Sequence, residues 1–478
     1  MPAVRMIVVT VMLVVALGAT SRQTGQDLVI AIRNVSVINP CRDATESGRT
    51  VIVEGGRIRA VQPASMPTPG GTRVIDGTGK YLIPGLWDSH VHLTKAGVTS
   101  LSLFLANGVT AVRDMGSDLH ELVSWRSRIA AGTLAGPRIK TSGQMLESQV
   151  NVDRMKRQGG VEPVDRLRIG LATPADARRA VDRLAAEGAD LIKVRSTPDL
   201  DTFRATVDAA RQHGVRVACH PVQGPAELAQ ARVGSIEHWV SYPPLQSRPR
   251  NERRALFAQL AAAGTFISTT FVNVDQSILV PYEEARRRVD DVAATLDPRR
   301  KYVGGYLVED WREQVEEKKT ESVEPFRKEV PGFVSDLREL RQARVPFLAG
   351  TDVGVAFMYP GFTLHDELDL LVHRLGFSPM ETLRIATHNP AIFFGLEKEI
   401  GCLEAGQVAD LVLLDGNPLS DIRNTRTIRG VMTAGRWLDR PALDRMLSNV
   451  EQQMKLSMQK ATDARESSSL ALTLLTLH

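Results

Sequence analysis

The feature that most constrains the fold of this 478-residue chain is an alternation of short apolar runs and amphipathic helical patterns between Pro84 and Phe394. In residues 174–188, for example, apolar side chains recur at the spacing of one helix face. The apolar runs are the segment ending in HVH, then GVTAVRD, PRIKTSG, ADLIKVR, GVRVACH, VGSIEH, GTFISTT and VPFLAGTD. Strand–helix alternation favours a parallel sheet, and eight such runs predict an α/β fold of the (β/α)8 TIM-barrel type.

The two ends of the chain have a different pattern. Residues 28–80 and 400–438 contain short alternating runs separated by glycine-rich turns, which is typical of antiparallel strands. Two β segments at opposite ends of a chain can pair, so we expect them to share one small domain. Residues 441–478 are interpreted as a polar helix followed by a Ser-rich tail.

Charge and hydropathy exclude two classes of protein. The chain has 59 Lys+Arg against 55 Asp+Glu, and 43% of its residues are hydrophobic. A disordered chain needs lower hydrophobicity and a higher net charge. Because acids match bases along the chain, we expect no nucleic-acid partner. The longest connection, residues 272–335, carries mixed charges in helical patterns; it is either a solvated helical insertion or a lid over the mouth of the barrel.

The N-terminus has the pattern of an export signal. Arg5 precedes an apolar run of 14 residues, Met6 to Ala19, and small residues and a polar segment follow it. This run is shorter than the roughly 20 residues that span a membrane. We therefore predict a signal peptide over residues 1–20 and a periplasmic or secreted protein with no stable membrane span after cleavage. The alternative is an N-terminal anchor that is not cleaved.

Polar residues end several of the apolar runs. His90 and His92 form an H-x-H pair, in which both side chains point to the same side of a strand. His220, His238 and Asp352 each end a later run. Parallel strands deliver the side chains at their carboxyl ends to one face of a barrel. A histidine that is buried only for packing explains one such position but not the ordered set, so we predict a metal site.

Lys193 lies inside the apolar run ADLIKVR, where an unpaired ammonium group is costly. One interpretation is a salt-bridged lysine or one that extends its amine to solvent. The other is a lysine whose pKa is lowered by two neighbouring divalent cations and by desolvation. A neutral amine can add CO2 and become a carbamate, which is an anionic bridge between two metal ions.

These residues occur in segments that together resemble the amidohydrolase superfamily, in particular its exported prolidase-like and imidazolonepropionase-like hydrolases. The resemblance covers residues 28 to 440. The matching segments are IDGTGKYLIPGLWDSHVHL, LFLANGVTAVRDMG, GADLIKV, SIEH, FLAGTD, ATHNPA and IGCLEAGQVADLVLLDGNP. The ordered set of HxH, Lys, His, His and Asp is the most specific part of this resemblance.

The resemblance implies a TIM barrel over residues 81–397 and a composite β-sandwich built from residues 27–80 and 398–440. It implies two metal ions, with His90, His92 and Asp352 on the more buried one and His220 and His238 on the other. Lys193 matches the carboxylated lysine that bridges them. Imidazole and carboxylate ligands favour Zn2+.

The chemistry that such a site implies is hydrolysis of an amide or a dipeptide-like bond. A water molecule bridging two ions becomes hydroxide near neutral pH and attacks the carbonyl carbon. Asp352 would take the proton and pass it to the leaving amine. The alternatives are a cyclic amide or lactam hydrolase of the imidazolonepropionase type, and a non-catalytic binding protein on a relic barrel; deamination fits less well. The sequence leaves the substrate and the oligomeric state open, a homo-oligomer included.

The mouth of the predicted barrel departs from the usual family pattern. Pro221 follows His220, and the segment after PRIKTSG lacks the usual Gly-rich loop with a histidine. Arg195 and Tyr242 are candidates for contacting a substrate carbonyl or carboxylate, or else are structural. His388 lies beyond the eighth strand, so we expect it to pack at the start of the last helix rather than to bind metal.

The chain has three cysteines. Cys41 and Cys402 lie in the two β segments that should share the small domain, and export permits a disulfide, so we hypothesise a Cys41–Cys402 bond. Cys219 neighbours His220 on its strand and therefore points to the opposite side, into the core.

Overall fold

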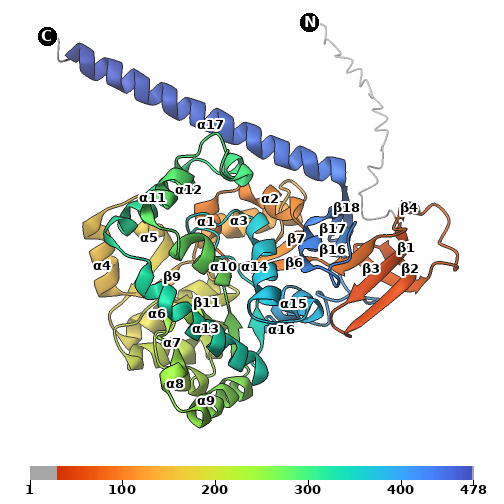
Figure 1. Cartoon of the computed structure of the whole chain (residues 1–478), viewed down its shortest axis with the longest axis horizontal. Coiled ribbons are helices and arrows are strands. Elements are labelled where there is room, and N and C mark those ends of the chain that lie inside the picture. Colours follow the sequence, from red (N-terminus) through yellow and green to blue (C-terminus); the bar gives the residue numbers. More distant parts are fainter. Residues whose placement is uncertain (1–28, 476–478) are drawn as a thin grey trace, which may run out of the picture.

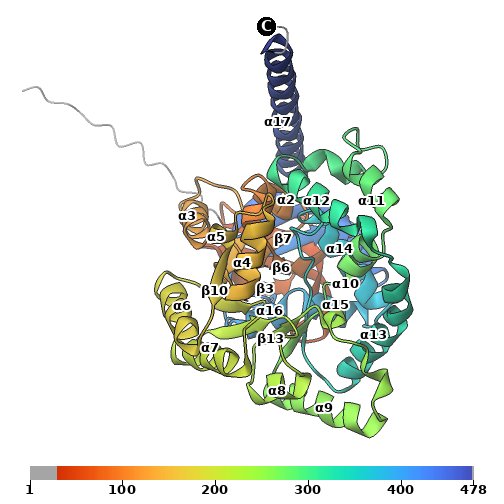
Figure 2. The ribbon, with the colours of Figure 1, turned by 90° about the vertical axis from the view of Figure 1, so that its left-hand side faces the viewer.

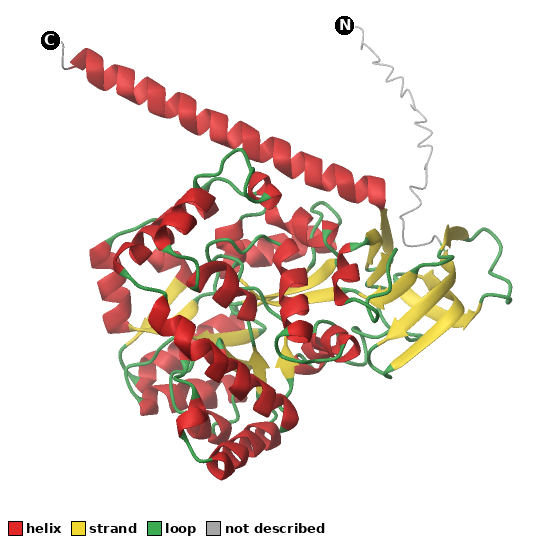
Figure 3. Ribbon diagram, viewed as in Figure 1, coloured by secondary structure: helices red, strands yellow, loops and turns green. Residues whose placement is uncertain are grey.

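The computed structural model describes residues 29–475, so the predicted signal peptide, residues 1–20, lies outside the described residues. The body is a set of central strands surrounded by helices, and most of the remaining strands gather at one end (Figure 3). Within the described range, no helix combines the length and apolarity that a membrane span requires.

All of the central strands are parallel and form two sheets (Figure 1). The first has the order β6 (Leu86–Val91), β7 (Val109–Asp114) and β8 (Arg138–Thr141). The second has the order β10 (Arg168–Leu171), β9 (Met145–Ser148), β11 (Leu191–Val194), β12 (Arg216–Cys219), β13 (Ser235–Glu237), β14 (Phe266–Ser268) and β15 (Phe347–Leu348). Each of the eight predicted runs supplies one of these strands; β9 and β10 were not predicted.

Backbone hydrogen bonds connect the two parallel sheets at two places. On one side, the amide of Ser89 in β6 donates to the carbonyl oxygen of Ala349 just after β15 (2.8 Å), and the amide of Asp352 donates to the carbonyl oxygen of His90 in β6 (2.7 Å). On the other side, the amide of Asp190 before β11 donates to Thr141 of β8 (2.7 Å). These bonds therefore join both edge strands of the first sheet, β6 and β8, to the second sheet.

Helices follow most of the central strands and cover their outer side (Figure 2). In chain order they are α1 (Leu93–Ala96), α2 (Ser100–Ala106), α3 (Leu119–Ala130), α4 (Gln149–Gln158), α5 (Val164–Leu167), α6 (Pro174–Ala186), α7 (Leu200–Gln212), α8 (Pro225–Gln230), α9 (Arg250–Ala263), α10 (Phe271–Asn273), α11 (Tyr282–Val289), α12 (Tyr306–Glu317), α13 (Glu324–Gln342), α14 (Phe362–His373), α15 (Pro379–Ile385), α16 (His388–Phe393) and α17 (Arg440–Leu475). Shorter turns are η1 (Trp239–Ser241), η2 (Leu245–Ser247), η3 (Val274–Ile278), η4 (Pro298–Tyr302), η5 (Lys318–Thr320) and η6 (Ile422–Arg426).

Strand alternation decides which side chains face the helices. Ile192 and Val194 of β11 belong to the main hydrophobic core with residues of α6 and α7. Leu191 belongs instead to a small separate cluster that contains Ala218. Because side chains alternate along a strand, Lys193 lies on the same side as Leu191, away from the helices.

The two chain ends meet in one sheet. It has the order β18 (Arg436–Asp439), β17 (Ile428–Thr433), β16 (Leu411–Leu414), β5 (Tyr81–Pro84), β1 (Ile30–Asn39), β2 (Ala44–Glu54) and β3 (Arg57–Pro63), with β4 (Arg73–Asp76) paired to β1. Strand β5, at the start of the predicted barrel segment, belongs to this sheet because it pairs with β1 and β16. Hydrogen bonding places the strands in a single sheet, and their packing as a sandwich stays a prediction.

The charged connection after β14 is helical, as predicted. Helices α11 and α12 pack around the fully buried Trp311 in a satellite hydrophobic cluster that includes Phe357 and Tyr359. Helix α13 continues to Gln342, beyond the predicted end of the insertion.

The C-terminal segment differs from the prediction of a polar helix followed by a Ser-rich tail. Helix α17 begins beside β18, packs through Leu443 and Val450, and then projects away from the body as far as Leu475 (Figures 1 and 2). The chain from Ala442 onward contains no glycine or proline that would end it, and the Ser-rich segment is therefore helical.

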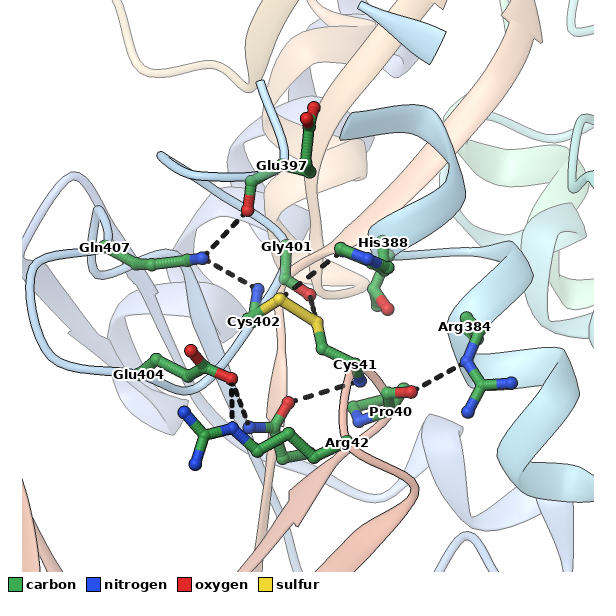
Figure 4. The surroundings of a disulfide bond; sticks show 12 residues. Pro40, Cys41, Arg42, Arg384, His388, Glu397, Gly401, Cys402, Glu404 and Gln407 are labelled. Atoms are coloured by element: carbon green, nitrogen blue, oxygen red, sulfur yellow. Dashed lines mark hydrogen bonds and ion pairs between the residues drawn. A yellow bond between two sulfur atoms is a disulfide. The ribbon is translucent and has the colours of Figure 1, made fainter. Parts of the chain in front are cut away.

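The hypothesised disulfide is confirmed. Cys41, two residues after the end of β1, is bonded to Cys402 in the loop before β16, with 5.8 Å between the Cα atoms. The bond joins the hairpin end of the small sheet to the loop that follows α16 (Figure 4). Cys219 is a free thiol buried in the main core, as expected from strand alternation.

Candidate metal centre

The predicted ligands converge at the carboxyl ends of the parallel strands. His90 lies near the end of β6, His220 directly follows β12, and His238 directly follows β13. A cavity of about 840 Å³ opens there, and His92, His220, His238 and Asp352 contribute to its lining. Strands of a parallel sheet end on the same side, so residues far apart in the sequence share this cavity.

Asp352 is the centre around which the imidazoles are arranged. Its Oδ1 lies 3.1 Å from His92 Nε2 and 3.5 Å from His90 Nε2, and its Oδ2 lies 3.8 Å from His238 Nε2. The ring of His220 is next, with its centroid 4.8 Å from that of His238. The ligand atoms of His90, His238 and Asp352 all lie within 4.8 Å of one another.

Three of the imidazoles are oriented through their other ring nitrogen. His90 Nδ1 lies 2.7 Å from Glu237 Oε2, His92 Nδ1 lies 3.2 Å from the carbonyl oxygen of Gly116, and His238 Nδ1 lies 2.7 Å from Thr270 Oγ1. With each Nδ1 occupied, each Nε2 is turned toward Asp352. Histidines that bind metal in proteins are oriented in this way by a second partner on the ring.

Sequence analysis missed the buried pair behind His90. Glu237 accepts hydrogen bonds from Arg113 Nη2 at 2.9 and 2.8 Å, and Ser235 Oγ also donates to it. Arg113 and Glu237 are both almost fully buried. The sequence did contain a signal for this pair, because Arg113 in GVTAVRD and Glu237 in SIEH are charged residues inside apolar runs. Pairing the two charges required knowledge of the strand order.

Lys193 is fully buried, and its Nζ has no hydrogen-bond partner among the described residues. Burial lowers the pKa of this amine to about 8, although the carboxylates of Glu237 and Asp352 oppose the shift. The lysine is therefore neither a salt-bridged residue nor one that extends to solvent. This is the environment in which the neutral amine becomes accessible near physiological pH.

The charge states of the other groups follow from the same burial. Desolvation, together with the positive charge of Lys193, lowers the pKa of His90 and of His220 well below the usual value. Desolvation also lowers the pKa of His238 to about 4. For Asp352 burial acts in the opposite direction, but the surrounding His238 and His90 hold its pKa well below the usual range. Neutral imidazoles and an ionised carboxylate are the forms that bind cations.

The backbone is strained at the same place. His238, Thr270 and Asp352 have φ values of 54°, 41° and 63°, in the left-handed region that non-glycine residues seldom adopt. Each follows the end of a strand and carries a side chain of the site or its support. Such strain persists where the surrounding contacts determine the conformation, and it clusters at functional sites.

The two predicted substrate contacts are placed differently. Arg195 lines the cavity, and its Nη1 lies 3.2 Å from Glu147 with 42% of the side chain exposed. Tyr242 lies outside the lining of this cavity; its hydroxyl donates to the carbonyl oxygen of Gln223 (2.7 Å), and its ring packs against Trp239. Only Arg195 is therefore brought together with the predicted ligands.

Two helical segments complete the cavity wall. Arg154 and Met155 of α4 line one part of it, and Asp310, Glu313 and Glu317 of α12 line another. The segment predicted as an insertion or lid therefore contributes directly to the wall. Lys95 connects the two parts, since its Nζ lies 2.9 Å from Glu162 and 3.2 Å from Asp310.

The donor set fits a cationic centre. His90 Nε2 and Lys193 Nζ are both buried without a hydrogen-bond partner in the described part of the chain, although polar groups this deep are nearly always satisfied. Both atoms lie close to Asp352. His90 lowers the pKa of Asp352, and the carboxylate of Asp352 opposes the lowering of the pKa of Lys193. A bound divalent cation would satisfy the imidazole nitrogens together with the carboxylate.

Comparison with known proteins identifies the class. The sequence profile of the Amidohydrolase family matches residues 81–438. An imidazolonepropionase from Symbiobacterium thermophilum is 24% identical over 395 residues, which are 77% of this chain and 84% of that protein.

Solved structures agree with this match. A candidate prolidase from Bifidobacterium longum has a TM-score of 0.65 and 27% identity, covering 88% of this chain and 99% of that one. A Xaa-Pro dipeptidase solved with bound methionine has a TM-score of 0.65 and 21% identity, covering 86% of this chain and 100% of that one.

The chain belongs to the amidohydrolase family, in its prolidase-like and imidazolonepropionase-like branch. It is a hydrolase that acts on carbon–nitrogen bonds.

Proposed function

We propose that this hydrolase cleaves the amide bond of a small dipeptide-like or N-acyl amino acid substrate in a two-metal site. The observation that carries the proposal is the convergence of His90, His92, His220, His238 and Asp352 beside the fully buried amine of Lys193, which has no hydrogen-bond partner among the described residues. We also propose that the two parallel sheets form one (β/α)8 barrel; the backbone bonds between β6 and the segment after β15, and between β8 and β11, support this.

The residues would divide between two ions. His90, His92 and Asp352 would hold the more buried ion, His220 and His238 the other, and carboxylated Lys193 would join them. When bound, two divalent ions of the Zn2+ type supply a water molecule that is acidic near neutral pH and polarise the substrate carbonyl. No serine or cysteine nucleophile is needed for this chemistry.

The chain's own groups supply the proton transfer and the orientation. Asp352 lies between the imidazole Nε2 atoms with its carboxylate ionised, so it is placed to accept the proton of the attacking water and to return it to the leaving nitrogen. Arg195, which is half exposed in the cavity wall, is placed to bind a substrate carboxylate. Helix α12 forms part of the cavity wall, so a bound substrate would lie against it.

A substrate screen with a matched pair of variants tests this function. Zn2+-loaded protein is assayed against dipeptides and N-acyl amino acids by detection of the released amine. Lys193→Ala should lose hydrolysis and part of its metal content. Lys140→Ala, which removes a partly exposed lysine paired with Asp190 (2.8 Å), should retain both. Metal content and hydrolysis that both survive Lys193→Ala would disprove the carbamate bridge, and one ion per chain would favour a mononuclear site.

A cyclic amide is the second candidate substrate. The imidazolonepropionase match extends over 77% of the chain, whereas similarity confined to the metal ligands would cover a few short segments. The same screen should include five-membered lactams and imidazolones, whose ring opening is followed by loss of absorbance. Turnover of these compounds without turnover of linear amides would select this candidate.

We further propose that the protein is exported. The Cys41–Cys402 disulfide supports this, because such bonds persist in oxidising compartments. Mass spectrometry of the protein purified from its native cell envelope or medium should give an N-terminus after residue 20 or close to it. A full-length mass that still includes Met1 would indicate an uncleaved anchor.

A further inference from the structure

A second group of potential metal ligands lies at the junction between the small sheet and α16. Its members are Cys41, Cys402 and His388, whose ligand atoms all lie within 4.8 Å of one another. His388 Nδ1 is 3.4 Å from Cys402 Sγ, and Cys41 Sγ is 3.2 Å from the carbonyl oxygen of Gly401 (Figure 4). None of the three lines the 840 Å³ cavity, so the group is separate from the candidate metal centre.

The ligand types are those of a zinc site. Two sulfur atoms and one imidazole nitrogen are three of the four ligands in the Cys2His2 and Cys3His classes. Zinc–sulfur and zinc–nitrogen bonds of about 2.3 and 2.0 Å at the tetrahedral angle place sulfur and nitrogen about 3.5 Å apart. The Cys402–His388 contact already has nearly this length.

The surrounding backbone is held independently of the disulfide. The amide of Cys402 donates to Gln407 Oε1 (2.9 Å), and Gln407 Nε2 donates to the carbonyl oxygen of Glu397 (3.0 Å). On the other side, Arg384 Nε donates to the carbonyl oxygen of Pro40 (2.8 Å). These bonds fix each loop separately, and Arg42 Nε, which donates to Glu404 Oε1 (2.6 Å), joins the two loops when the sulfur–sulfur bond is opened.

Access is also suitable. Cys41 and His388 are half-buried and Cys402 is buried, so a cation can enter while one coordination position stays open to water.

We propose that reduction of the Cys41–Cys402 disulfide creates a second, redox-controlled metal site, formed by both thiolates and His388, for a divalent cation of the zinc class. A dithiol supplies two electrons and two protons, the sulfur–sulfur bond breaks, and two thiols form while the dithiol becomes a disulfide. The cation then binds the two sulfur atoms, and the two thiol protons pass to solvent. In the reverse step a small-molecule disulfide takes up two electrons and two protons and becomes a dithiol, while the Cys41–Cys402 bond forms again and the ion is released.

Spectroscopy with Co2+ tests this proposal on the full chain. Thiolate ligands give Co2+ an intense near-ultraviolet charge-transfer band, which imidazole and carboxylate ligands do not give. The protein is reduced anaerobically with a dithiol, the dithiol is removed, new thiols are counted, and Co2+ is added. We expect two new thiols and a band that saturates at one thiolate-bound Co2+ per chain. The oxidised protein should give no such band.

Three variants assign the ligands. Cys41→Ser with Cys402→Ser should abolish the band, and Cys219→Ser should leave it unchanged. His388→Ala should weaken Co2+ binding on the order of tenfold or more, since even supporting residues of metal sites have effects of that size. Because only thiolate-bound cobalt is observed, the result does not depend on hydrolysis or on the candidate metal centre.

Three results would overturn the proposal. One is a disulfide that the dithiol does not reduce in the folded protein. Another is reduced wild-type protein with two new thiols but no charge-transfer band. The third is a band that persists in the Cys41→Ser, Cys402→Ser double variant, because it would then arise from Cys219.

Discussion

At the scale of single residues, the candidate metal centre depends on buried residues that do not line the cavity. The ring of His90 is held through Nδ1 by Glu237, and Glu237 is held by Arg113. This buried chain of charges leaves His90 Nε2 free to face Asp352. Removing one member of a buried pair leaves the other charge uncompensated, so the arrangement is sensitive to a change of one atom.

Glu237→Gln is the corresponding prediction. The amide no longer balances Arg113, so the free energy of unfolding should fall by about 3–5 kcal/mol. The affinity for Zn2+ should fall by about 10- to 100-fold because the orientation of His90 is no longer enforced. Chemical denaturation and competition with a chelating dye measure the two effects.

Asp201→Asn is the matched control for Glu237→Gln. Asp201 and Arg204 form an exposed pair at 3.7 Å, and its loss should cost about 0.5 kcal/mol or less with no change in Zn2+ affinity. Equal effects of the two substitutions would contradict the role assigned to Glu237.

At the scale of elements, α12 connects stability to the cavity. Its Trp311 is fully buried against Phe357 and Tyr359, while Glu313 and Glu317 on the same helix line the cavity. The cluster around Trp311 is separate from the main core. We therefore expect α12 to loosen locally before the rest of the molecule unfolds.

Trp311→Ala tests this coupling. The cavity left behind should cost about 3–5 kcal/mol, which is the usual range for burying an alanine in place of a core tryptophan. Amide exchange should accelerate in residues 282–317, and KM should rise more than kcat falls. Trp437→Ala, on a half-buried residue of β18, should leave both KM and that exchange unchanged. A KM unaffected by Trp311→Ala would separate α12 from substrate binding.

Helix α14 carries a carboxyl group that makes stability depend on pH. Glu367 is fully buried, accepts a hydrogen bond from the amide of Val272 (2.7 Å) and contacts Thr269. Desolvation raises its pKa from 4.5 to about 7. A pKa raised by folding means that the stability present below pH 4.5 is lost as the pH rises through 7.

Glu367→Gln should remove this dependence. Between pH 5 and pH 8.5 the variant should gain about 1–3 kcal/mol of unfolding free energy relative to the wild type. Urea denaturation of both proteins at the two pH values measures the difference in unfolding free energy. The contributions of the other titrating groups cancel because both proteins share them. A difference that does not change with pH would mean that Glu367 is ionised in the folded protein throughout.

At the scale of the whole molecule, one covalent bond joins the small sheet to the helical body. Cys41 and Cys402 are 361 residues apart in the sequence, so the bond closes a loop that contains most of the described chain. A cross-link of this length restricts the unfolded ensemble strongly.

The double variant Cys41→Ser, Cys402→Ser should lose about 2–5 kcal/mol of unfolding free energy. Thermal unfolding followed by circular dichroism detects this as a lower Tm. A dithiol should lower the Tm of the wild type in the absence of added metal and leave the double variant unaffected. An equal decrease of Tm in both proteins would show that the dithiol acts by a route other than reduction of this disulfide.

Local patterns in the sequence were sufficient to predict the strands and the positions of the candidate ligands in or after them. The eight runs, His90, His92, Lys193, His220, His238 and Asp352 were all predicted from alternation and position. Both signals lie within a few neighbouring residues, since side-chain direction has a period of two in a strand.

Only the tertiary structure decided which distant residues meet. It paired Arg113 with Glu237, moved β5 into the end sheet, added β9 and β10, and placed Tyr242 outside the cavity. It also placed His388 against the Cys41–Cys402 bond rather than only at a helix start. These outcomes depend on strand order and loop paths, which are set by packing across hundreds of residues rather than by the preferences of adjacent ones.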